Sequence, residues 1–456
     1  MTKPFGRFSR AAAALLIVLC AAMGTSDGSS PKQMKRVGRP PLRPIQGLRA
    51  EKPLPRRRLP RYAADRVLVR FRSDVNETYA DGLLRSYGFP VVRRIPGIGV
   101  YSVRTAAGVS VAETLAMLRR NGDIELARPD YRVRLAEIPN DTYFLKYQYS
   151  LLNRGGILDV SPEIQPQMTA GADIKATTAW DVAKGDPETV IAIVDTGVDR
   201  THPDLSGKVV SAGHDFANDD DDATDDHWHG THVAGIAAAD TDNGIGVAGV
   251  AWNCRILPVK VLDANGDGFY SWIIDGIIWA ADHGANVINL SLGGDVDDPF
   301  LKDACKYAHD KGIVVVAAAG NDGAPMVLFP AAYDDYVLAV AASDYNDAIA
   351  EFSNFGAEVD VAAPGVWILG PAPQLYVGTG FLPYLFASGT SAASPHVAGL
   401  AALIRSAKPS LSADDIMKII RYTADDINAT TYPGRDDHAG YGRVNLDRAL
   451  VPYILK

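Results

Sequence analysis

The chain has 456 residues, of which 47% are hydrophobic and 22% are charged, so it can bury a large core, and its length alone predicts two or three domains. Its charge is divided unevenly, because residues 1–136 carry a net charge of +16 and the remaining residues carry −25. The basic residues of the first part lie in a proline-rich tract without a base-reading motif, so we exclude a nucleic-acid partner and expect the two parts to attract each other.

The first 24 residues have the pattern of a secretory signal peptide. Three basic residues precede an apolar run from Ala11 to Ala22, and Met23, Gly24 and polar residues follow it. The run is too short to cross a membrane comfortably. A lipid anchor on Cys20 is the alternative, but Leu19 before it is bulkier than lipoprotein signals usually carry. We therefore expect a secreted protein, with no membrane association once the signal is removed, over a periplasmic or lipid-anchored one.

Residues 25–61 are rich in proline and basic residues and poor in apolar ones, which predicts a disordered linker. Within it, Arg56 to Arg58 form either a processing site or part of a solvated basic tract. Residues 62–136 are predicted to form a small α+β domain of the ferredoxin-like type, in the order strand, helix, strand, strand, helix, strand. The expected strands are 65–71, 90–95, 99–105 and 124–134, and the expected helices are 77–88 and 111–122.

Residues 137–456 alternate strand-like and helix-like segments, which predicts the α/β class with a doubly wound, mostly parallel sheet. The expected strands are Val190 to Val194, Arg255 to Val261, Val287 to Leu290, Ile313 to Ala318 and Tyr336 to Val340.

Three stretches of this region each present one chemically active side chain. TVIAIVDTGVDRTHPDL (189–205) is a buried-strand pattern that delivers Asp195 at its carboxyl end, where open α/β sheets place their sites. HGTHVAGIAAA (229–239) opens a small-residue helix on His229, and FASGTSAASPHVAGLAALI (386–404) leaves Ser391 at the start of another helix. A helix N-terminus favours negative charge beside that hydroxyl. A lone serine there is usually an N-cap, so the argument depends on all three stretches.

The order Asp, His, Ser is that of the subtilisin triad, and the three stretches resemble the signature blocks of the subtilisin-like serine proteases, over residues 140–450. The resemblance implies a serine endopeptidase that hydrolyses peptide bonds through an acyl-enzyme. It implies that Ser391 attacks the scissile carbonyl, that His229 takes and returns the proton, and that Asp195 orients the imidazole. It also assigns the oxyanion site to the Asn321 amide and the Ser391 backbone N–H.

Residues 62–136 resemble the inhibitory propeptide of secreted subtilases. The resemblance implies a zymogen that processes itself near residues 136–138, leaving a peptidase domain of residues 137–456. The partners that follow are protein or peptide substrates and the chain's own propeptide, which acts as an inhibitor and folding aid. We expect a monomer.

Three alternatives remain for the catalytic interpretation. His232 in the same block competes with His229 for the role of base, although the family uses the first histidine of HGTHVAG; His202 and His396 are interpreted as structural. A catalytically silent relative that serves as a binding module is the first rival function. An esterase of the α/β-hydrolase class is the second, but it needs G-x-S-x-G, whereas Ser391 lies in G-T-S-A-A.

The resemblance also indicates where substrate lies, extended between two exposed edges. One edge consists of Ser291, Leu292 and Gly293, and the other of Gly266, Asp267 and Gly268. Apolar residues occupy the positions that match the family's pockets for substrate side chains. They predict an enzyme that prefers apolar substrate residues or accepts a broad range of them. An EF-hand interpretation of DANGDG (263–268) fails because the closing glutamate is missing.

Calcium is the expected cofactor, as one or two structural ions. Hard oxygen ligands in flexible loops suit Ca²⁺, although a solvated acidic loop is the alternative for DFANDDDDATDD (215–226). The resemblance to thermitase-like relatives selects Asp215, Asp220 and Asp222 for one site. A second site resembles the family's strong one and consists of Asp141, Asp204 and Asn243 with nearby backbone carbonyls.

Two cysteines of the peptidase region, Cys254 and Cys305, lie in apolar stretches and are interpreted as buried thiols, with a single disulfide as the alternative. The loop 366–386 is longer than usual for the family and rich in Leu, Tyr and Phe, so it would extend the cleft beyond the scissile bond or bind a partner.

Overall fold

The computed structural model describes residues 62–131, 138–376 and 383–450. The predicted signal peptide and linker, most of the predicted cleavage region and the tip of the 366–386 loop lie outside these residues. The chain divides into two units, Met1–Arg132 and Val133–Lys456, and each is considered by itself. Among the described helices, none is long and apolar enough to cross a membrane.

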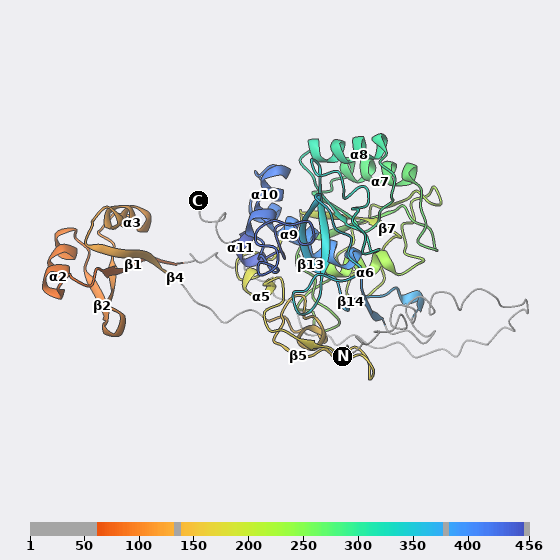
Figure 1. The fold of residues 1–456 in the computed structure, drawn as a ribbon. Helices are drawn as coiled ribbons and strands as arrows, with labels where there is room; N and C mark the ends of the chain where they lie inside the picture. Colours follow the sequence, from red (N-terminus) through yellow and green to blue (C-terminus); the bar gives the residue numbers. More distant parts are fainter. Residues whose placement is uncertain (1–61, 132–137, 377–382, 451–456) are drawn as a thin grey trace, which may run out of the picture. The chain divides into compact units, whose positions relative to one another are not determined.

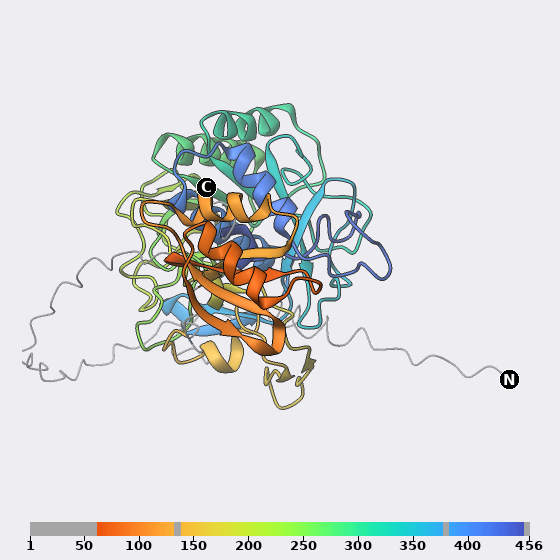
Figure 2. The ribbon, with the colours of Figure 1, turned by 90° about the vertical axis from the view of Figure 1, so that its left-hand side faces the viewer.

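The first unit has the predicted order of elements and forms an antiparallel sheet in the order β2-β3-β1-β4. Figure 2 shows both of its longer helices on the same side of the strands. The elements are β1 (Tyr62–Phe71), α2 (Glu77–Ser86), β2 (Val91–Ile95), η1 (Pro96–Ile98), β3 (Val100–Arg104), α3 (Val111–Arg119) and β4 (Ile124–Tyr131).

The core of this unit lies between the sheet and the two helices. Alternate residues of β1, Val67, Val69 and Phe71, are buried there against Leu84 of α2 and Leu118 of α3. Strand β4 lies at the edge of the sheet and pairs with β1 alone among the described strands. The unit therefore has its own core, and of its two edge strands, β2 and β4, the second lies next to the point where the chain leaves the unit.

The second unit is built on a seven-stranded sheet in the order β13-β12-β11-β10-β7-β9-β8, with parallel pairing throughout. The strands are almost continuously apolar because helices cover both faces. Their bounds are β7 (Val190–Asp195), β8 (His214–Asp215), β9 (Arg255–Lys260), β10 (Val287–Leu290), β11 (Val314–Ala318), β12 (Val337–Ser343) and β13 (Val359–Pro364).

Two groups of helices cover the two faces of this sheet. Helices α7 (Tyr270–Asp282) and α8 (Pro299–Asp310) lie side by side on one face (Figure 1). The other face holds α6 (His229–Ala238), α9 (Thr390–Ala407) and α10 (Ala413–Thr423). Shorter elements are α4 (Phe144–Tyr147), β5 (Gly156–Ile157), β6 (Gln167–Met168), α5 (Ala176–Ala179), β14 (Ile368–Pro371), η2 (Gln374–Tyr376), β15 (Tyr384–Ala387) and α11 (Leu446–Leu450).

The strand order reverses between β7 and β10. From β7 the chain passes to β8 at the edge of the sheet and returns to β9, which lies between β8 and β7. From β10 it continues outward through β11, β12 and β13 on the other side. In open α/β sheets, ligands bind outside the carboxyl ends of the strands at such a switch point. The fold therefore places a site beside Asp195, the last residue of β7.

The two described cysteines are free and buried, which confirms the prediction of buried thiols. Cys254 belongs to the core on the α9 face and Cys305 to the core on the α8 face, so the sheet separates them. Burial raises the pKa of the Cys305 thiol to about 12. Both thiols are therefore protonated and poorly reactive near neutral pH.

Candidate active site

Strand β7 and helix α6 bring a carboxylate and an imidazole together. The Asp195 Oδ1 atom lies 2.8 Å from His229 Nδ1 and also accepts the Thr196 N–H at 2.7 Å. Asp195 is completely buried, and its Oδ2 has no hydrogen-bond partner among the described residues. The carboxylate therefore holds the ring by Nδ1 and leaves Nε2 as the free nitrogen.

The electrostatic environment keeps His229 basic. Burial lowers its pKa, but the charge of Asp195 and the hydrogen bond to it act in the opposite direction and outweigh burial, so the pKa of His229 is raised. An imidazole held in this way can accept a proton from a neighbouring hydroxyl.

Helix α9 runs in the same direction as α6 and carries Ser391 to the same end. A Cβ built on Gly399, eight residues after Ser391, would lie 3.0 Å from the carbonyl oxygen of Ala237, eight residues after His229. Nearer the start of both helices, the His396 imidazole of α9 acts electrostatically on His232 of α6. The first turns of the two helices therefore lie beside each other. Among the described residues, no hydrogen bond joins the Ser391 hydroxyl to His229, a contact that often tightens only when substrate is bound.

Three polar atoms, one hydroxyl oxygen and two nitrogens, lie close to the backbone of Gly389. A Cβ built on this residue would lie 2.8 Å from Ser391 Oγ and 3.6 Å from both Asn321 Nδ2 and the Ser391 backbone nitrogen. The hydroxyl, the amide and the backbone N–H thus converge on one small space that a side chain at Gly389 would fill. This is the arrangement that an oxyanion site requires.

The orientation of the Asn321 amide is fixed by Thr390, a buried residue that the sequence did not single out. Asn321 Oδ1 accepts the Thr390 N–H at 2.8 Å and the Thr390 hydroxyl at 2.9 Å. With its oxygen engaged by two donors, the amide directs its NH₂ group toward the space beside Ser391.

A buried polar network supports the backbone of Ser391. Ser291 Oγ donates to the Ser391 carbonyl at 2.8 Å, lies 2.9 Å from Ser394 Oγ and accepts from Asn289 Nδ2 at 2.9 Å. Ser394 in turn donates to Asn289 Oδ1 at 3.0 Å. Every member of this network has a partner, so it holds the first turn of α9 rigidly against the end of β10.

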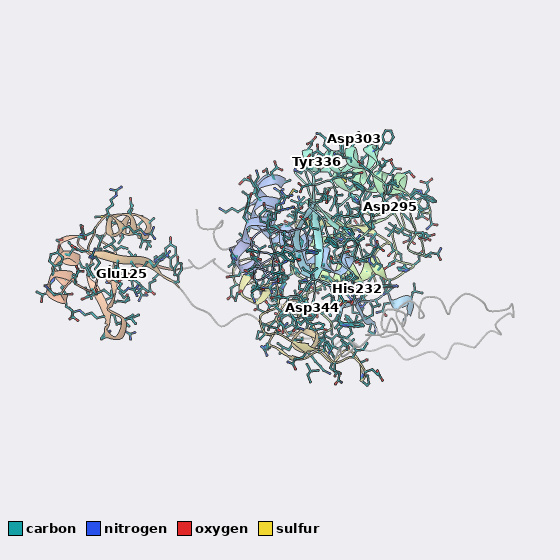
Figure 3. The ribbon with its side chains drawn as sticks, in the orientation of Figure 1. Glu125, His232, Asp295, Asp303, Tyr336 and Asp344 are labelled. Atoms are coloured by element: carbon teal, nitrogen blue, oxygen red, sulfur yellow. The ribbon has the colours of Figure 1, made fainter. Side chains whose placement is uncertain are left out.

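The structure places the competing histidines in structural roles. His232 is buried in the second unit (Figure 3), with Nε2 3.1 Å from the Ile368 carbonyl, and burial lowers its pKa to about 4. His396 is likewise buried against the Ala392 carbonyl at 2.9 Å, and His202 lies 2.9 Å from the Pro383 carbonyl. None of these imidazoles contacts the carboxylate of Asp195 as His229 does.

Asp225, four residues before His229, supports the start of α6 and was missed in the sequence. Its Oδ2 accepts the Thr231 N–H at 2.9 Å and the Thr231 hydroxyl at 2.6 Å, and its Oδ1 accepts the Thr196 hydroxyl at 2.8 Å. Burial raises the pKa of Asp225 to about 6. The carboxylate therefore joins the end of β7 to the helix that carries His229. Asp225 belongs to the acidic run 215–226, and every aspartate of that run was interpreted as a calcium ligand or a solvated charge.

The two predicted substrate edges follow β9 and β10. Ser291, Leu292 and Gly293 continue directly from β10, and Gly266, Asp267 and Gly268 form the turn that leads into α7. A Cβ on Gly293 would lie 2.9 Å from Leu328 Cβ, and one on Gly268 would lie 2.5 Å from the Val261 carbonyl, so neither position has room for a side chain. Leu292 and Tyr270 are partly buried and pack against the same hydrophobic core, so the surroundings of the two edges are apolar.

The residues of one predicted calcium site are brought together. Asp141 Oδ2 accepts the Asp242 N–H at 2.9 Å, while Asp204 Oδ1 accepts from Asn243 Nδ2 at 2.9 Å. Asp141 Oδ1 is buried without a hydrogen-bond partner among the described residues, and burial is the main cause that raises its pKa to about 6. Two buried carboxylates and an orphaned oxygen fit a hard cation. Tyr384 also contacts this site, because its hydroxyl donates to Asp204 Oδ2 at 2.9 Å.

The acidic loop has a different arrangement. Asp215 accepts the N–H groups of Ala217 and Asn218, and Asp220 and Asp222 each cap the turn two residues further along. In the part of the chain that the structure describes, no three His, Cys, Asp or Glu side chains gather as they would around a metal ion. The three carboxylates are thus not brought together.

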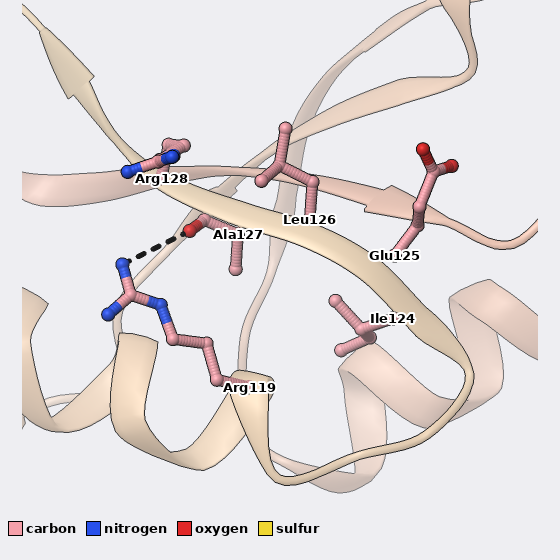
Figure 4. A pocket seen from close by; sticks show the side chains of 6 residues that line it. All are labelled: Arg119, Ile124, Glu125, Leu126, Ala127 and Arg128. Atoms are coloured by element: carbon pink, nitrogen blue, oxygen red, sulfur yellow. Dashed lines mark hydrogen bonds between the residues drawn. The ribbon is translucent and has the colours of Figure 1, made fainter.

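Two partly open pockets of the described residues lie away from these residues. One, of about 270 Å³, lies in the first unit beside β4, where Arg119 reaches the Ala127 carbonyl at 3.4 Å (Figure 4). Another, of about 390 Å³, is lined by residues such as Asp186, Asn286 and Arg405. Neither is lined by Asp195, His229 or Ser391.

Comparison with known proteins identifies two family models along the chain. The model of the subtilase family, Peptidase S8, matches residues 186–442, and the model of the fervidolysin N-terminal prodomain matches residues 52–130. The first match contains all four candidate catalytic residues, and the second covers all but the last of the residues that the structure describes in the first unit.

Individual relatives agree with both models. The thermophilic serine proteinase of Bacillus sp. (strain AK1) is 44% identical over 391 residues, which cover 86% of this chain and 88% of that protein. Thermitase of Thermoactinomyces vulgaris is 45% identical over 313 residues, 68% of this chain and 99% of thermitase. Among solved structures, fervidolysin from Fervidobacterium pennivorans, described as a keratinolytic enzyme related to subtilisin, has a TM-score of 0.56 at 30% identity and covers 85% of this chain and 61% of its own.

Proposed function

Because this chain belongs to the subtilase family and is a subtilisin-like serine peptidase with a prodomain, we propose that it is a secreted endopeptidase, made as a zymogen that processes itself with Ser391 as nucleophile. One observation carries the proposal. The Asp195–His229 hydrogen bond and the convergence of the Ser391 hydroxyl with two N–H donors occur at the same end of two adjacent helices.

The reaction follows from the positions of these groups. His229 Nε2 accepts the proton of Ser391 Oγ as the oxygen attacks the scissile carbonyl, and the buried carboxylate of Asp195 stabilises the resulting imidazolium. The developing oxyanion accepts hydrogen bonds from Asn321 Nδ2 and the Ser391 N–H. The imidazolium then protonates the leaving amine, and water hydrolyses the acyl-enzyme by the reverse proton transfers.

Substrate binds as an extended strand between the two edges, with its backbone read by Ser291 to Gly293 and Gly266 to Gly268. Glycines on both edges support close approach of backbone to backbone. The apolar side chains beside them, among them Leu292 and Tyr270, support a preference for apolar substrate residues.

The first unit acts as the intramolecular inhibitor in this proposal. Its strand β4 has an open edge and ends at Tyr131, shortly before residues 136–138, where cleavage is expected. Calcium bound by Asp141, Asp204 and Asn243 would supply positive charge that offsets two buried carboxylates, and it would hold the segment after the cleavage point to the body of the enzyme.

The test is the intact mass of the purified protein, expressed without its signal peptide and with calcium present. Wild type should lose roughly the first 137 residues, whereas Ser391→Ala should remain whole. Ser388→Ala, three residues earlier in the same segment, is the matched control and should be processed. If wild type stays whole and cleaves no peptide, the silent-relative interpretation replaces this one. If Ser391→Ala is cut as wild type is, an outside protease acts and the role of Ser391 in maturation is refuted.

A further inference from the structure

His227 lies two residues before the catalytic base and faces one of the two proposed substrate edges. A Cβ built on Gly266 would lie 3.7 Å from both Cε1 and Nε2 of the His227 ring. The residue is half-buried, so part of its ring remains accessible. The Nε2 side of this imidazole therefore lies against the turn at Gly266.

The ring is held in place by its neighbours. The His227 backbone N–H donates to Asp225 Oδ1 at 3.0 Å, and the ring stacks on Trp228 with 5.4 Å between centroids and 26° between planes. The Trp228 indole in turn contacts the His229 ring edge-on, at 5.6 Å. Trp228 thus links the His227 ring to the packing around the His229 imidazole.

The tautomer of His227 follows from a buried atom. Its Nδ1 is buried and has no hydrogen-bond partner among the described residues. A buried N–H without an acceptor is rarer and costlier than an unused lone pair, so the neutral ring carries its hydrogen on Nε2. A hydrogen-bond donor therefore faces the substrate edge.

We propose that His227 is a specificity-determining residue, whose Nε2–H binds the side chain of the substrate residue lying along Gly266 to Gly268 and selects an acceptor there, a carboxamide when the ring is neutral and a carboxylate when it is charged. The inference rests on the proposed peptidase function and adds a side-chain subsite to it.

The surrounding charges set the direction of the pH effect. Burial lowers the pKa of His227, and the nearby His229 and Lys260 lower it further, while Asp195 and Asp226 raise it; the net effect is a lowered pKa. Asp263 and Asp267 lie on the turn that the ring faces. At neutral pH the ring is uncharged, and these carboxylates disfavour an acidic substrate residue. Protonation adds one positive charge, so the preference for a carboxylate rises as pH falls.

The experiment compares two fluorogenic peptides that differ only by Glu or Gln, placed in turn at each of the four positions before the cut. The quantity measured is the ratio of kcat/KM for the Glu peptide to that for the Gln peptide between pH 5.5 and 8. Titration of His229 cancels in this ratio because both peptides react with the same enzyme form. At one position the wild-type ratio should rise about 2- to 5-fold toward low pH, as for a partly exposed ion pair.

His227→Gln, which cannot titrate, should make this ratio independent of pH. The matched control is His283→Gln, since His283 also stacks on a tryptophan, Trp279, at 3.9 Å and 14°, but belongs to the end of α7; it should behave as wild type. His227→Asn serves as the second variant if His227→Gln fails to fold. A rise that persists in the folded variant, or a wild-type ratio that is flat at all four positions, overturns the inference. Absence of any peptide cleavage refutes the proposed function instead.

Discussion

Thr390 donates to the side-chain oxygen Oδ1 of Asn321 with both of its donors, the backbone N–H at 2.8 Å and the hydroxyl at 2.9 Å. The same hydroxyl accepts the Gly320 N–H at 3.1 Å, so the threonine joins the end of β11 to the first turn of α9. The residue that precedes the nucleophile thereby orients the amide proposed to stabilise the oxyanion.

Thr390→Val removes the hydroxyl at nearly constant volume and leaves the backbone hydrogen bond intact. We expect kcat to fall about tenfold with little change in KM, because the Asn321 amide loses part of its orientation and acts only in the transition state. Steady-state kinetics on a peptide substrate measure this split. Thr390→Ser keeps the hydroxyl and should retain most of the activity; equal kcat in Thr390→Val and wild type would show that the backbone bond suffices.

Gly389→Ala should inactivate the enzyme without unfolding it. The added methyl group would lie 2.8 Å from Ser391 Oγ and would occupy the space on which the oxyanion donors converge, so we expect kcat/KM to fall by at least about 100-fold. The backbone at Gly389 is extended, with φ 164°, which other residues adopt readily. Thermal unfolding should therefore change little. Gly207→Ala, where a Cβ meets nothing within 4 Å, is the control for the substitution itself.

The raised pKa of His229 should set the pH at which kcat/KM declines on the acid side of its pH profile, which is called the acid limb below. Burial lowers this pKa, but the charge and hydrogen bond of Asp195 prevail, so it lies above its ordinary value of 6.5. The base must be neutral, so kcat/KM should decline as pH falls through that raised value. Asp195→Asn should move the limb to lower pH and reduce kcat by about 10⁴-fold. An unmoved limb in this variant would mean that another group titrates.

Calcium should stabilise the second unit through Asp141 and Asp204. Saturation at about 100 times the dissociation constant contributes about 2.7 kcal/mol, which corresponds to a rise in Tm of roughly 4 °C for a domain of this size. Chelation should remove this rise in wild type, and Asp141→Asn should make Tm insensitive to calcium. Asp220→Asn is the comparison, because its carboxylate caps a local turn, and it should respond to calcium as wild type does. Calorimetric scans with calcium and with chelator decide the question.

The elements that the sequence predicted well are those whose residues are uniformly buried. Strand β10 was placed at its observed bounds, and β7 and β9 within one residue at their ends, because parallel strands covered on both faces read as short apolar runs. Strand β13 was missed, since VDVAAP contains an aspartate and a proline that argue against a strand. The hairpin of β14 and β15 was missed because its segment was interpreted as a loop.

The candidate catalytic residues came from motif and chain order, whereas the groups that position them did not. The hydrogen bonds of Thr390 to Asn321 and of Asp225 to Thr231 join residues that are either adjacent to a motif or hidden in an acidic run. Their roles depend on side-chain orientation at the meeting of separate elements, which no local pattern encodes. Burial distinguishes Asp225 from its exposed neighbours, and burial is visible only in the fold.

Helix α9 follows all seven strands of the main sheet in the chain, and it carries the proposed nucleophile in its first turn. A ribosome therefore adds the strands of the sheet, the proposed base and the proposed oxyanion amide before it adds the hydroxyl oxygen that is proposed to attack a peptide bond. Every nascent chain that stalls or is released before residue 391 lacks that oxygen, whatever it manages to fold. With Ser391 as the proposed nucleophile, the order of synthesis leaves truncated products without the means to cleave a peptide bond, independently of any inhibitor.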